Sequence, residues 1–183
     1  MFSTERLWLY ALEEGDYYHL MCLHNDVQIQ RMRPIDAGHW LAPRSCAFGK
    51  QWVQELITNK DTMVFIFRLR PDDVVGILDV NVLSAKNRNA TFGIMISPKH
   101  WSKGYGTEVL TWLINYVFVE LGLHWLALDV FASNTRAIRL YQRLGFMEEG
   151  REREAYWNSG KWEDVVKMSM LESDWKKEAK PGA

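Results

Sequence analysis

The chain has 183 residues, of which 48% are hydrophobic and 25% are charged, and its formal net charge is −1. This balance is typical of a folded protein with one core of ordinary domain size, and it excludes an intrinsically disordered chain. A charge so close to zero excludes the strongly basic class of proteins, so nucleic acid is not expected as a partner.

The first half of the chain predicts one strand, two helices and a set of three strands. Residues 6–12 form a short apolar stretch, and residues 13–26 and 44–58 have helical patterns. Three stretches rich in β-branched and aromatic residues follow, at residues 63–69, 74–83 and 90–97. The turns between these stretches are too short for a parallel crossover, so an antiparallel meander is expected.

The second half predicts a helix, a strand and another helix. Apolar residues recur every three or four positions over residues 105–121, directly before a glycine that is a natural helix end. A strand at residues 125–131 precedes the second helix. That helix is expected to begin at Ser133 or Asn134 as N-cap and to stop at Gly145.

A hairpin completes the predicted fold. Its strands are residues 146–157 and 161–171, joined by an Asn-Ser-Gly turn. The order of elements predicts an α+β fold with one βαβ-like crossover, in a single domain over residues 1–175. Residues 176–183 are expected to be a disordered tail.

Several other classes of protein are not indicated by the sequence. Cys22 and Cys46 have neither a CxxC spacing nor a zinc spacing, which favours free thiols in a reducing compartment over a disulfide. No apolar run resembles a signal peptide or is long enough to cross a membrane. The five histidines show no i, i+4 pair with a third ligand. We therefore expect a cytoplasmic protein with no metal and no membrane partner.

A turn with two glycines joins the strand at 90–97 to the helix at 105–121. This glycine turn, residues 98–108, has the sequence P-K-H-W-S-K-G-Y-G-T-E. Gly104 and Gly106 allow positive φ and a close approach of a ligand to the backbone. The unpaired amides at the start of the helix favour an anion such as a pyrophosphate. The glycine pair alone favours a tight turn that binds nothing, since it matches neither a dinucleotide fingerprint nor a P-loop.

A second motif makes the glycine turn specific. The segment W-S-K-G-Y-G-T-E is followed by V-F-A-S-N-T-R-A-I-R-L-Y-Q-R-L-G-F, at residues 130–146. Together they resemble the GNAT superfamily of acetyl-CoA-dependent N-acetyltransferases. Within it they resemble the branch that holds ribosomal-protein N-terminal acetyltransferases and spermidine acetyltransferases. The resemblance covers residues 6–171. It implies a three-layer α/β/α fold with four helices, and a mixed, mostly antiparallel sheet of about seven strands that includes one splayed strand pair.

The resemblance also implies where coenzyme A binds. In this family the backbone of the strand before the glycine turn pairs with the pantetheine arm, and the turn amides hold the pyrophosphate. The matching positions here are Ile94, Met95 and Ile96 for the arm, and Ser102, Lys103, Gly104, Tyr105, Gly106 and Thr107 for the pyrophosphate. The side chains of the strand residues are expected to belong to the core. Trp101 departs from the family, which often has Gln or Arg at that position.

Two residues of the second motif match family positions near the coenzyme. Asn134 corresponds to an asparagine near the pantetheine arm, and it is equally suited to cap the helix. Tyr141 corresponds to a tyrosine beside the coenzyme sulfur in many relatives, although an amphipathic helix would bury a tyrosine there in any case. Within hydrogen-bond reach of the leaving thiolate, a phenol acts as a general acid.

The general base does not carry over from the family. Relatives often have a glutamate in A-E-I-G on the strand before the glycine turn, whereas this chain has A-T-F-G with Thr91 at that position. Asp79 and Asp129 are the candidate catalytic carboxylates, because each lies among apolar residues on a strand. Each is also consistent with a structural ion pair, and a water chain without a dedicated base is a further option.

The resemblance implies an amine as acyl acceptor, bordered by the loop at residues 31–43 and the hairpin turn at 156–162. Arg31 and Arg33 would repel a polyamine, and Asp36 is the one acid of that loop, beside His39 and Trp40. This favours a peptide or protein N-terminus or a small amine, with a polyamine as the alternative acceptor.

The leading functional hypothesis is an N-acetyltransferase in which the amine attacks acetyl-CoA directly in a ternary complex. The alternative is a catalytically weak, CoA-binding regulatory module, because Thr91 replaces the family carboxylate. The oligomeric state is open, with a homodimer as one option.

Overall fold

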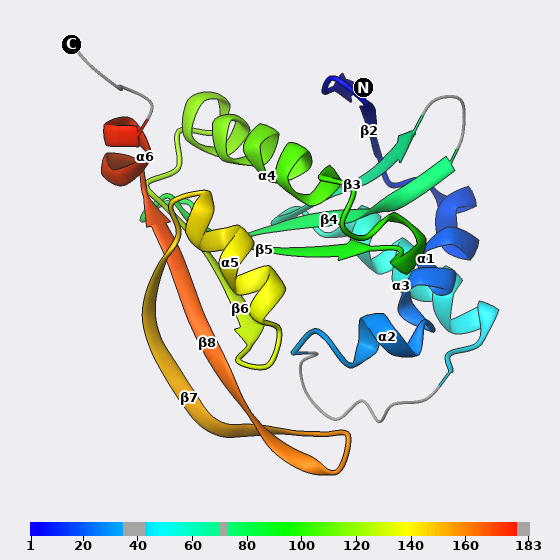
Figure 1. Ribbon diagram of the computed structural model, residues 1–183. Coiled ribbons are helices and arrows are strands. Elements are labelled where there is room, and N and C mark those ends of the chain that lie inside the picture. The colour runs from blue at the N-terminus through cyan, green and yellow to red at the C-terminus, as the bar shows by residue number, and fades with distance from the viewer. Residues whose placement is uncertain (35–42, 70–72, 179–183) are drawn as a thin grey trace. The chain divides into compact units, whose positions relative to one another are not determined.

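The computed structural model describes residues 1–34, 43–69 and 73–178 (Figure 1). Within them the chain divides into two compact units. One unit comprises Met1–Arg31, Phe92–Val109 and the described residues of Ile35–Asn81, and the other comprises Met32–Pro34, Val82–Thr91 and the described residues from Leu110 onward. Because the chain passes between the units several times, no single cut in the sequence separates them. The single domain over residues 1–175 stays a prediction.

The first part of the chain contains three strands and three α-helices. They are β1 (Phe2–Ser3), β2 (Leu7–Ala11), α1 (Tyr17–His24), α2 (Val27–Gln30), α3 (Cys46–Thr58) and β3 (Thr62–Leu69). The prediction of one helix over 13–26 was wrong at both ends, because a 3-10 turn at Glu14–Asp16 precedes α1. A new helix, α2, begins after Asp26, whose carboxylate accepts the Gln28 amide at 2.8 Å.

The later elements match the expected order. They are β4 (Asp73–Ser84), β5 (Asn89–Ile96), α4 (Tyr105–Asn115), β6 (Trp125–Phe131), α5 (Thr135–Arg143), β7 (Met147–Asn158), β8 (Lys161–Leu171) and α6 (Glu172–Glu178). A π-helical turn, Tyr116–Glu120, continues α4. Helix α6 extends past Trp175, where the tail was expected to begin, and residues 179–183 lie outside the described part.

The eight strands are hydrogen-bonded in the order β1-β2-β3-β4-β5-β6-β8-β7. The described pairs are antiparallel except β5 with β6, which is parallel and joined through α4, as the predicted crossover requires. The α+β class is therefore confirmed, with eight strands instead of about seven and six α-helices instead of four in the described residues. Pairing of β5 with β6 is described for three residue pairs, Asn89↔Trp125, Ala90↔Leu126 and Thr91↔Ala127. The expected splay beyond them stays a prediction.

The first unit has its core beneath α1 and α3, which Figure 1 shows side by side. Buried apolar residues of α1, α2, α3 and just past the end of β2 meet side chains of β4 and β5: Leu12, Leu20, Leu23, Ile29, Val53, Ile77 and Met95. Gly76 on β4 is required by this packing, because a Cβ there would lie 2.1 Å from the main-chain oxygen of Met95.

The second unit is built around the hairpin of β7 and β8, the long ribbon in Figure 1. Strand β8 pairs with β6 over seven residue pairs and buries one apolar side chain after another, including Val166, Met168 and Met170. Helix α4 and its continuation bury the predicted apolar stripe, and Phe118 stacks on Trp175 of α6 with ring centres 5.5 Å apart. As predicted, glycines end both helical segments, with φ of +60° at Gly122 and +92° at Gly145.

Candidate active site

The glycine turn lies in the first unit, between β5 and α4. Its backbone is left-handed at Gly104, with φ of +85°, as expected, and also at Ser102, with φ of +60°. Gly106 was expected to share this conformation, but it lies in the first turn of α4. A serine in this region costs about 1–3 kcal/mol, and such strained residues concentrate at ligand sites. Alternating backbone conformations of this kind gather successive amides into an anion-binding hollow.

The amides of the turn are oriented by the start of α4. The first described backbone bond of the helix runs from the Glu108 amide to the Gly104 oxygen at 3.1 Å. In the described part of the chain, the amides of residues 102–107 donate to no backbone oxygen. Such donors at a helix start, with the positive end of the dipole, suit a doubly charged anion.

Trp101 fixes the entry into this turn. Its indole nitrogen donates to the Ile96 oxygen at 2.7 Å, and its ring packs against the core of the first unit. The tryptophan that departs from the family pattern therefore has a structural role at this position. The backbone of Ser97 is held in turn by the Val75 oxygen at 2.9 Å, so the end of β5 is fixed from two sides.

Strand β5 carries the three residues expected along the pantetheine arm. The Met95 side chain is 5% exposed and belongs to the core, as expected. Ile94 and Ile96 are half-buried. Whether their backbone holds a ligand stays a prediction.

Asp79 on β4 lies over the backbone of Gly93 on β5, within the first unit. A Cβ at Gly93 would lie 2.6 Å from the Asp79 Oδ1, so the glycine provides room for the carboxylate. Its Oδ2 accepts the Asn81 side-chain amide at 2.9 Å, and Asn81 accepts the Thr62 hydroxyl at 2.8 Å. Asp79 continues the strand face that buries Ile77, so it stands where the apolar core gives way to polar groups.

The other base candidate has a different environment. Asp129 on β6 has a side chain that is 51% exposed, and its Oδ2 lies 3.8 Å from the Lys167 Nζ. Such exposed pairs contribute little stability. Thr91, in the position of the family glutamate, is half-buried and pairs with Ala127.

Asn134 in the second unit is the N-cap of α5, as predicted. Its Oδ1 accepts the Ala137 amide at 3.3 Å, and its Nδ2 donates to the main-chain oxygen of Met32 at 3.1 Å. The preceding amide, that of Ser133, donates to the Glu163 Oε1 at 3.1 Å. The start of α5 is therefore held from β8 and from the segment that leads into the loop at 31–43.

Tyr141 lies on the buried face of α5 and is 7% exposed. Burial raises the pKa of its phenol to about 12, and the positive charge of Arg33 opposes this rise. The hydroxyl therefore stays protonated at neutral pH, as a proton donor requires.

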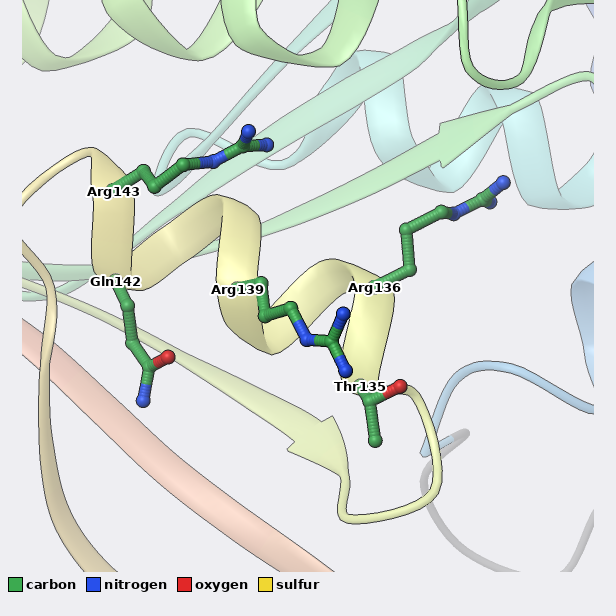
Figure 2. Close-up of a pocket in the computed structure, with 5 residues that line it drawn as sticks. All are labelled: Thr135, Arg136, Arg139, Gln142 and Arg143. Atoms are coloured by element: carbon green, nitrogen blue, oxygen red, sulfur yellow. The ribbon is translucent and has the colours of Figure 1, made fainter.

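The opposite face of α5 is basic. Figure 2 shows Arg136 and Arg143 extending to one side of the helix and Gln142 to the other. A hollow of about 660 Å³ is lined by Thr135, Arg136, Arg139, Gln142 and Arg143. With three arginines and no acid between Thr135 and Arg143, this face is suited to an anionic group.

The sequence analysis missed two charged residues, one at the glycine turn and one at the start of α5. Arg6 donates directly to Lys103 and Glu108 of the glycine turn, and Glu163 is a 5% exposed carboxylate on β8. Neither residue belongs to a recognisable sequence motif. Each reaches its contacts only in the folded chain. The acceptor loop residues Asp36, His39 and Trp40 lie outside the described residues. Within the ranges that are described, no group of three or more His, Cys, Asp or Glu is arranged to hold a metal ion.

Comparison with known proteins agrees with this geometry. The profile of the family described as "Acetyltransferase (GNAT) domain" matches residues 6–147, which include the glycine turn, Asn134 and Tyr141. The chain belongs to the GNAT acetyltransferase family.

Several relatives of this GNAT protein match over most of its length. The spermidine N(1)-acetyltransferase of Vibrio cholerae is 28% identical over 174 residues, covering 93% of this chain and 95% of the relative. An N-acetyltransferase of Bacillus subtilis, YoaA, is 33% identical over 177 residues, covering 92% and 95%. A crystal structure of the Vibrio cholerae spermidine N-acetyltransferase with CoA and spermine has a TM-score of 0.82 at 27% identity, covering 93% of this chain and 98% of that one.

The predicted activity class is confirmed. The protein is an acyl-CoA-dependent N-acetyltransferase that acts on an amine. In the part of the chain that the structure describes, no helix is both long and apolar enough to span a membrane.

Proposed function

We propose that this protein transfers the acetyl group of acetyl-CoA to a primary amine, with the glycine turn as the pyrophosphate site. The observation that carries this is the turn itself: left-handed Ser102 and Gly104 lead directly into the open amides of α4. A dianion is the ligand that such a site stabilises most, and CoA carries one between its adenosine and its pantetheine.

The reaction proposed is direct attack of the neutral amine on the thioester carbonyl. The new C–N bond forms, the C–S bond breaks, and the amine loses one proton while the thiolate gains one. No covalent enzyme intermediate is needed. An alkyl amine with a pKa of about 10.4 is neutral in only about 1 of 2,500 molecules at pH 7, a handicap of roughly 4–5 kcal/mol. An α-amine with a pKa of about 8 has a handicap of only about 1 kcal/mol.

Tyr141 is the proposed proton donor to the thiolate. Its buried phenol has a pKa of about 12. An ordinary thiol has a pKa near 8.5, so full proton transfer from such a phenol is uphill by roughly 5 kcal/mol. The nearby positive charge of Arg33 reduces this difference, because it favours the ionised form of the phenol. Tyr141 therefore acts as a hydrogen-bond donor whose acidity Arg33 increases.

Asp79 is the preferred base, and Asp129 is the second candidate. The Asp79 carboxylate lies beside the backbone of β5 at Gly93, on the strand proposed to run along the pantetheine arm. Its Oδ2 accepts a hydrogen bond from the Asn81 side-chain amide, which fixes the orientation of the carboxylate. Asp129 lies within ion-pair distance of a lysine at the surface, where it is less suited to extract a proton.

A polyamine is the first acceptor to test. Both the Vibrio cholerae enzyme and its Escherichia coli counterpart are named for spermidine. A peptide N-terminus is the second acceptor to test, because Arg31 and Arg33 would repel a polycation. In addition, a Bacillus subtilis relative that matches 56% of this chain is named as a candidate ribosomal N-acetyltransferase. A cytoplasmic location and a homodimer remain predictions.

The experiment is CoA release from acetyl-CoA over a panel of spermidine, spermine, free amino acids and short peptides with different N-termini. We expect turnover with at least one class and thermal stabilisation by acetyl-CoA but not by ATP or NAD. Stabilisation by CoA without turnover on any acceptor would instead favour the CoA-binding regulatory module. Thr91, in the position of the family glutamate, is the residue that supports this alternative. The absence of both turnover and CoA binding would refute the proposal.

A further inference from the structure

Arg6, just before β2, makes three contacts with the glycine turn and the first turn of α4, and it lies close to Gly104. Its Nη1 donates to the Lys103 oxygen at 3.1 Å, and its Nε donates to the Glu108 Oε2 at 2.7 Å. Its Cζ lies 4.6 Å from the centre of the Tyr105 ring. Its Nη2 lies 3.2 Å from where a Cβ of Gly104 would be. One planar guanidinium thus contacts Lys103, Tyr105 and Glu108 and lies beside Gly104.

Glu108 holds the guanidinium in place. Its Oε1 accepts the Arg6 main-chain amide at 2.8 Å and the Thr4 hydroxyl at 2.5 Å, and its side chain is only 14% exposed. Burial alone would raise the pKa of this carboxyl, but the hydrogen bonds from Thr4 and Arg6 outweigh burial and lower it. Glu108 is therefore ionised at neutral pH and acts as a fixed anchor for Arg6.

Without Arg6, this arrangement would oppose anion binding. An ionised carboxylate in the first turn of a helix is favourable for the helix dipole, but it would repel a pyrophosphate at the same amides. Arg6 neutralises Glu108 and at the same time fixes the Lys103 carbonyl. Because that carbonyl belongs to the Lys103–Gly104 peptide, fixing it also fixes the direction of the Gly104 amide.

We propose that Arg6 is a positioning residue for the coenzyme: it holds the peptide units from Lys103 to Tyr105 so that the amides at the start of α4 converge on the pyrophosphate. This inference rests on the proposed use of acetyl-CoA. The geometry requires the planar guanidinium of an arginine, and the point charge of a lysine would not replace it. Three of its groups are used at once: Nε contacts Glu108, Nη1 contacts Lys103, and the guanidinium plane contacts the Tyr105 ring.

The test compares two acetyl donors in wild-type protein and in Arg6→Lys. Acetyl-CoA carries the pyrophosphate, whereas S-acetylpantetheine presents the same thioester without it. We expect Arg6→Lys to lower kcat/KM for acetyl-CoA by about 10- to 100-fold, mainly through KM, since small misplacement of binding groups has effects of this size. With S-acetylpantetheine we expect a change of less than about twofold, because no pyrophosphate is present to be misplaced.

Arg68→Lys is the matched control. Arg68 also forms an ion pair with a carboxylate, that of Asp16, and its Cζ lies 5.7 Å from the Tyr10 ring centre. Arg68→Lys is expected to change stability, but its effect on kcat/KM should be the same with acetyl-CoA and with S-acetylpantetheine. Equal losses with both donors in Arg6→Lys, or a response equal to that of Arg68→Lys, would overturn the role of Arg6.

Calorimetric binding of CoA provides a readout that does not depend on turnover. CoA affinity is expected to fall about 10-fold in Arg6→Lys while pantetheine affinity is unchanged. If the wild-type chain binds CoA but acetylates nothing, the enzymatic proposal fails and this loss of affinity still decides the role of Arg6. A wild-type chain that binds no CoA would overturn both.

Discussion

The side-chain amide of Asn134 joins the N-cap of α5 to the main-chain oxygen of Met32, 3.1 Å away and 102 residues earlier in the chain. Its oxygen meanwhile accepts the Ala137 amide at 3.3 Å. One residue therefore both begins a helix and fixes the segment that leads into the expected acceptor loop.

These two roles of Asn134 are separable by substitution. Asn134→Ala is expected to lower the free energy of unfolding by about 1–2 kcal/mol, because the helix loses its cap. Asn134→Ser retains a good cap, so it should recover most of this stability while still lacking the bond to Met32. Urea denaturation measures the first effect and the acceptor KM the second. An acceptor KM in Asn134→Ser equal to that of wild type would show that the Met32 bond has no functional effect.

Tyr141→Phe removes the proposed proton donor without changing the packing of its ring. We expect kcat to fall about 100- to 10,000-fold, the usual range for loss of a general acid, while the affinity for CoA changes little. Steady-state kinetics and calorimetry together make this comparison. Tyr18→Phe is the control, since that side chain is 60% exposed on α1, and its kinetics should match wild type. A rate for Tyr141→Phe within about threefold of wild type would remove Tyr141 from the mechanism.

Arg33 is expected to influence the rate through Tyr141. Its positive charge lowers the pKa of the phenol, so Arg33→Gln should raise that pKa further and make the donor weaker. The expected result is a lower kcat that does not fall further when Tyr141 is already phenylalanine, which a double-mutant cycle measures. Arg153→Gln, at an exposed position of β7, is the control. Additive losses in the cycle would contradict this coupling.

Gly76 is predicted to be intolerant of any side chain. A Cβ there would lie 2.1 Å from the Met95 oxygen and 2.5 Å from the Phe67 Cζ, and the first of these is a backbone atom that a rotamer change does not move. Gly76→Ala should cost about 3 kcal/mol of stability. Gly150→Ala, where no atom lies within 4 Å of the added carbon, should be close to neutral. Thermal unfolding of the two variants checks the difference, and equal melting temperatures would contradict it.

The anchor at Glu108 predicts a pH dependence. The pKa of Glu108 is lowered in the folded protein, so its ionised form is favoured by folding. The stability that it contributes is therefore fully present above the pKa of the unfolded chain, about 4.3, and is lost as pH falls through the lower folded pKa. The melting temperature of the wild type should fall more steeply below about pH 4.5 than that of Glu108→Gln. Parallel curves for the two proteins would contradict the assignment.

Much of the fold follows from local signals. The strand at Trp125–Phe131 was predicted at both ends, and α5 begins at the predicted Asn134 cap and stops before Gly145. These boundaries depend on residues that are close in sequence. Helix α2 was missed because four residues are too few to show a helical period. The π-helical turn at Tyr116–Glu120 continues the apolar stripe of α4, so its pattern does not differ from that of an α-helix.

The candidate site was predictable only as far as its motifs extend. The amides of the glycine turn follow from two glycines before a strong helix, but the left-handed conformation at Ser102 does not, since serine rarely adopts it. The contacts of Arg6 with Glu108, of Asn134 with Met32 and of Asp79 over Gly93 join residues that meet only in the folded chain. No local pattern specifies such pairs.

Strand β7 is the last in the sheet order, so its outer edge has no neighbour within the described sheet. Long open edges of this kind invite pairing with a second chain and eventual aggregation. Here the edge carries alternating acids and bases, among them Glu152, Arg153 and Glu154, and the register with β8 is interrupted in two places. Charge and irregularity together make the strand a poor template for fibril growth. Replacing these charged residues with valines is expected to make this edge self-associate.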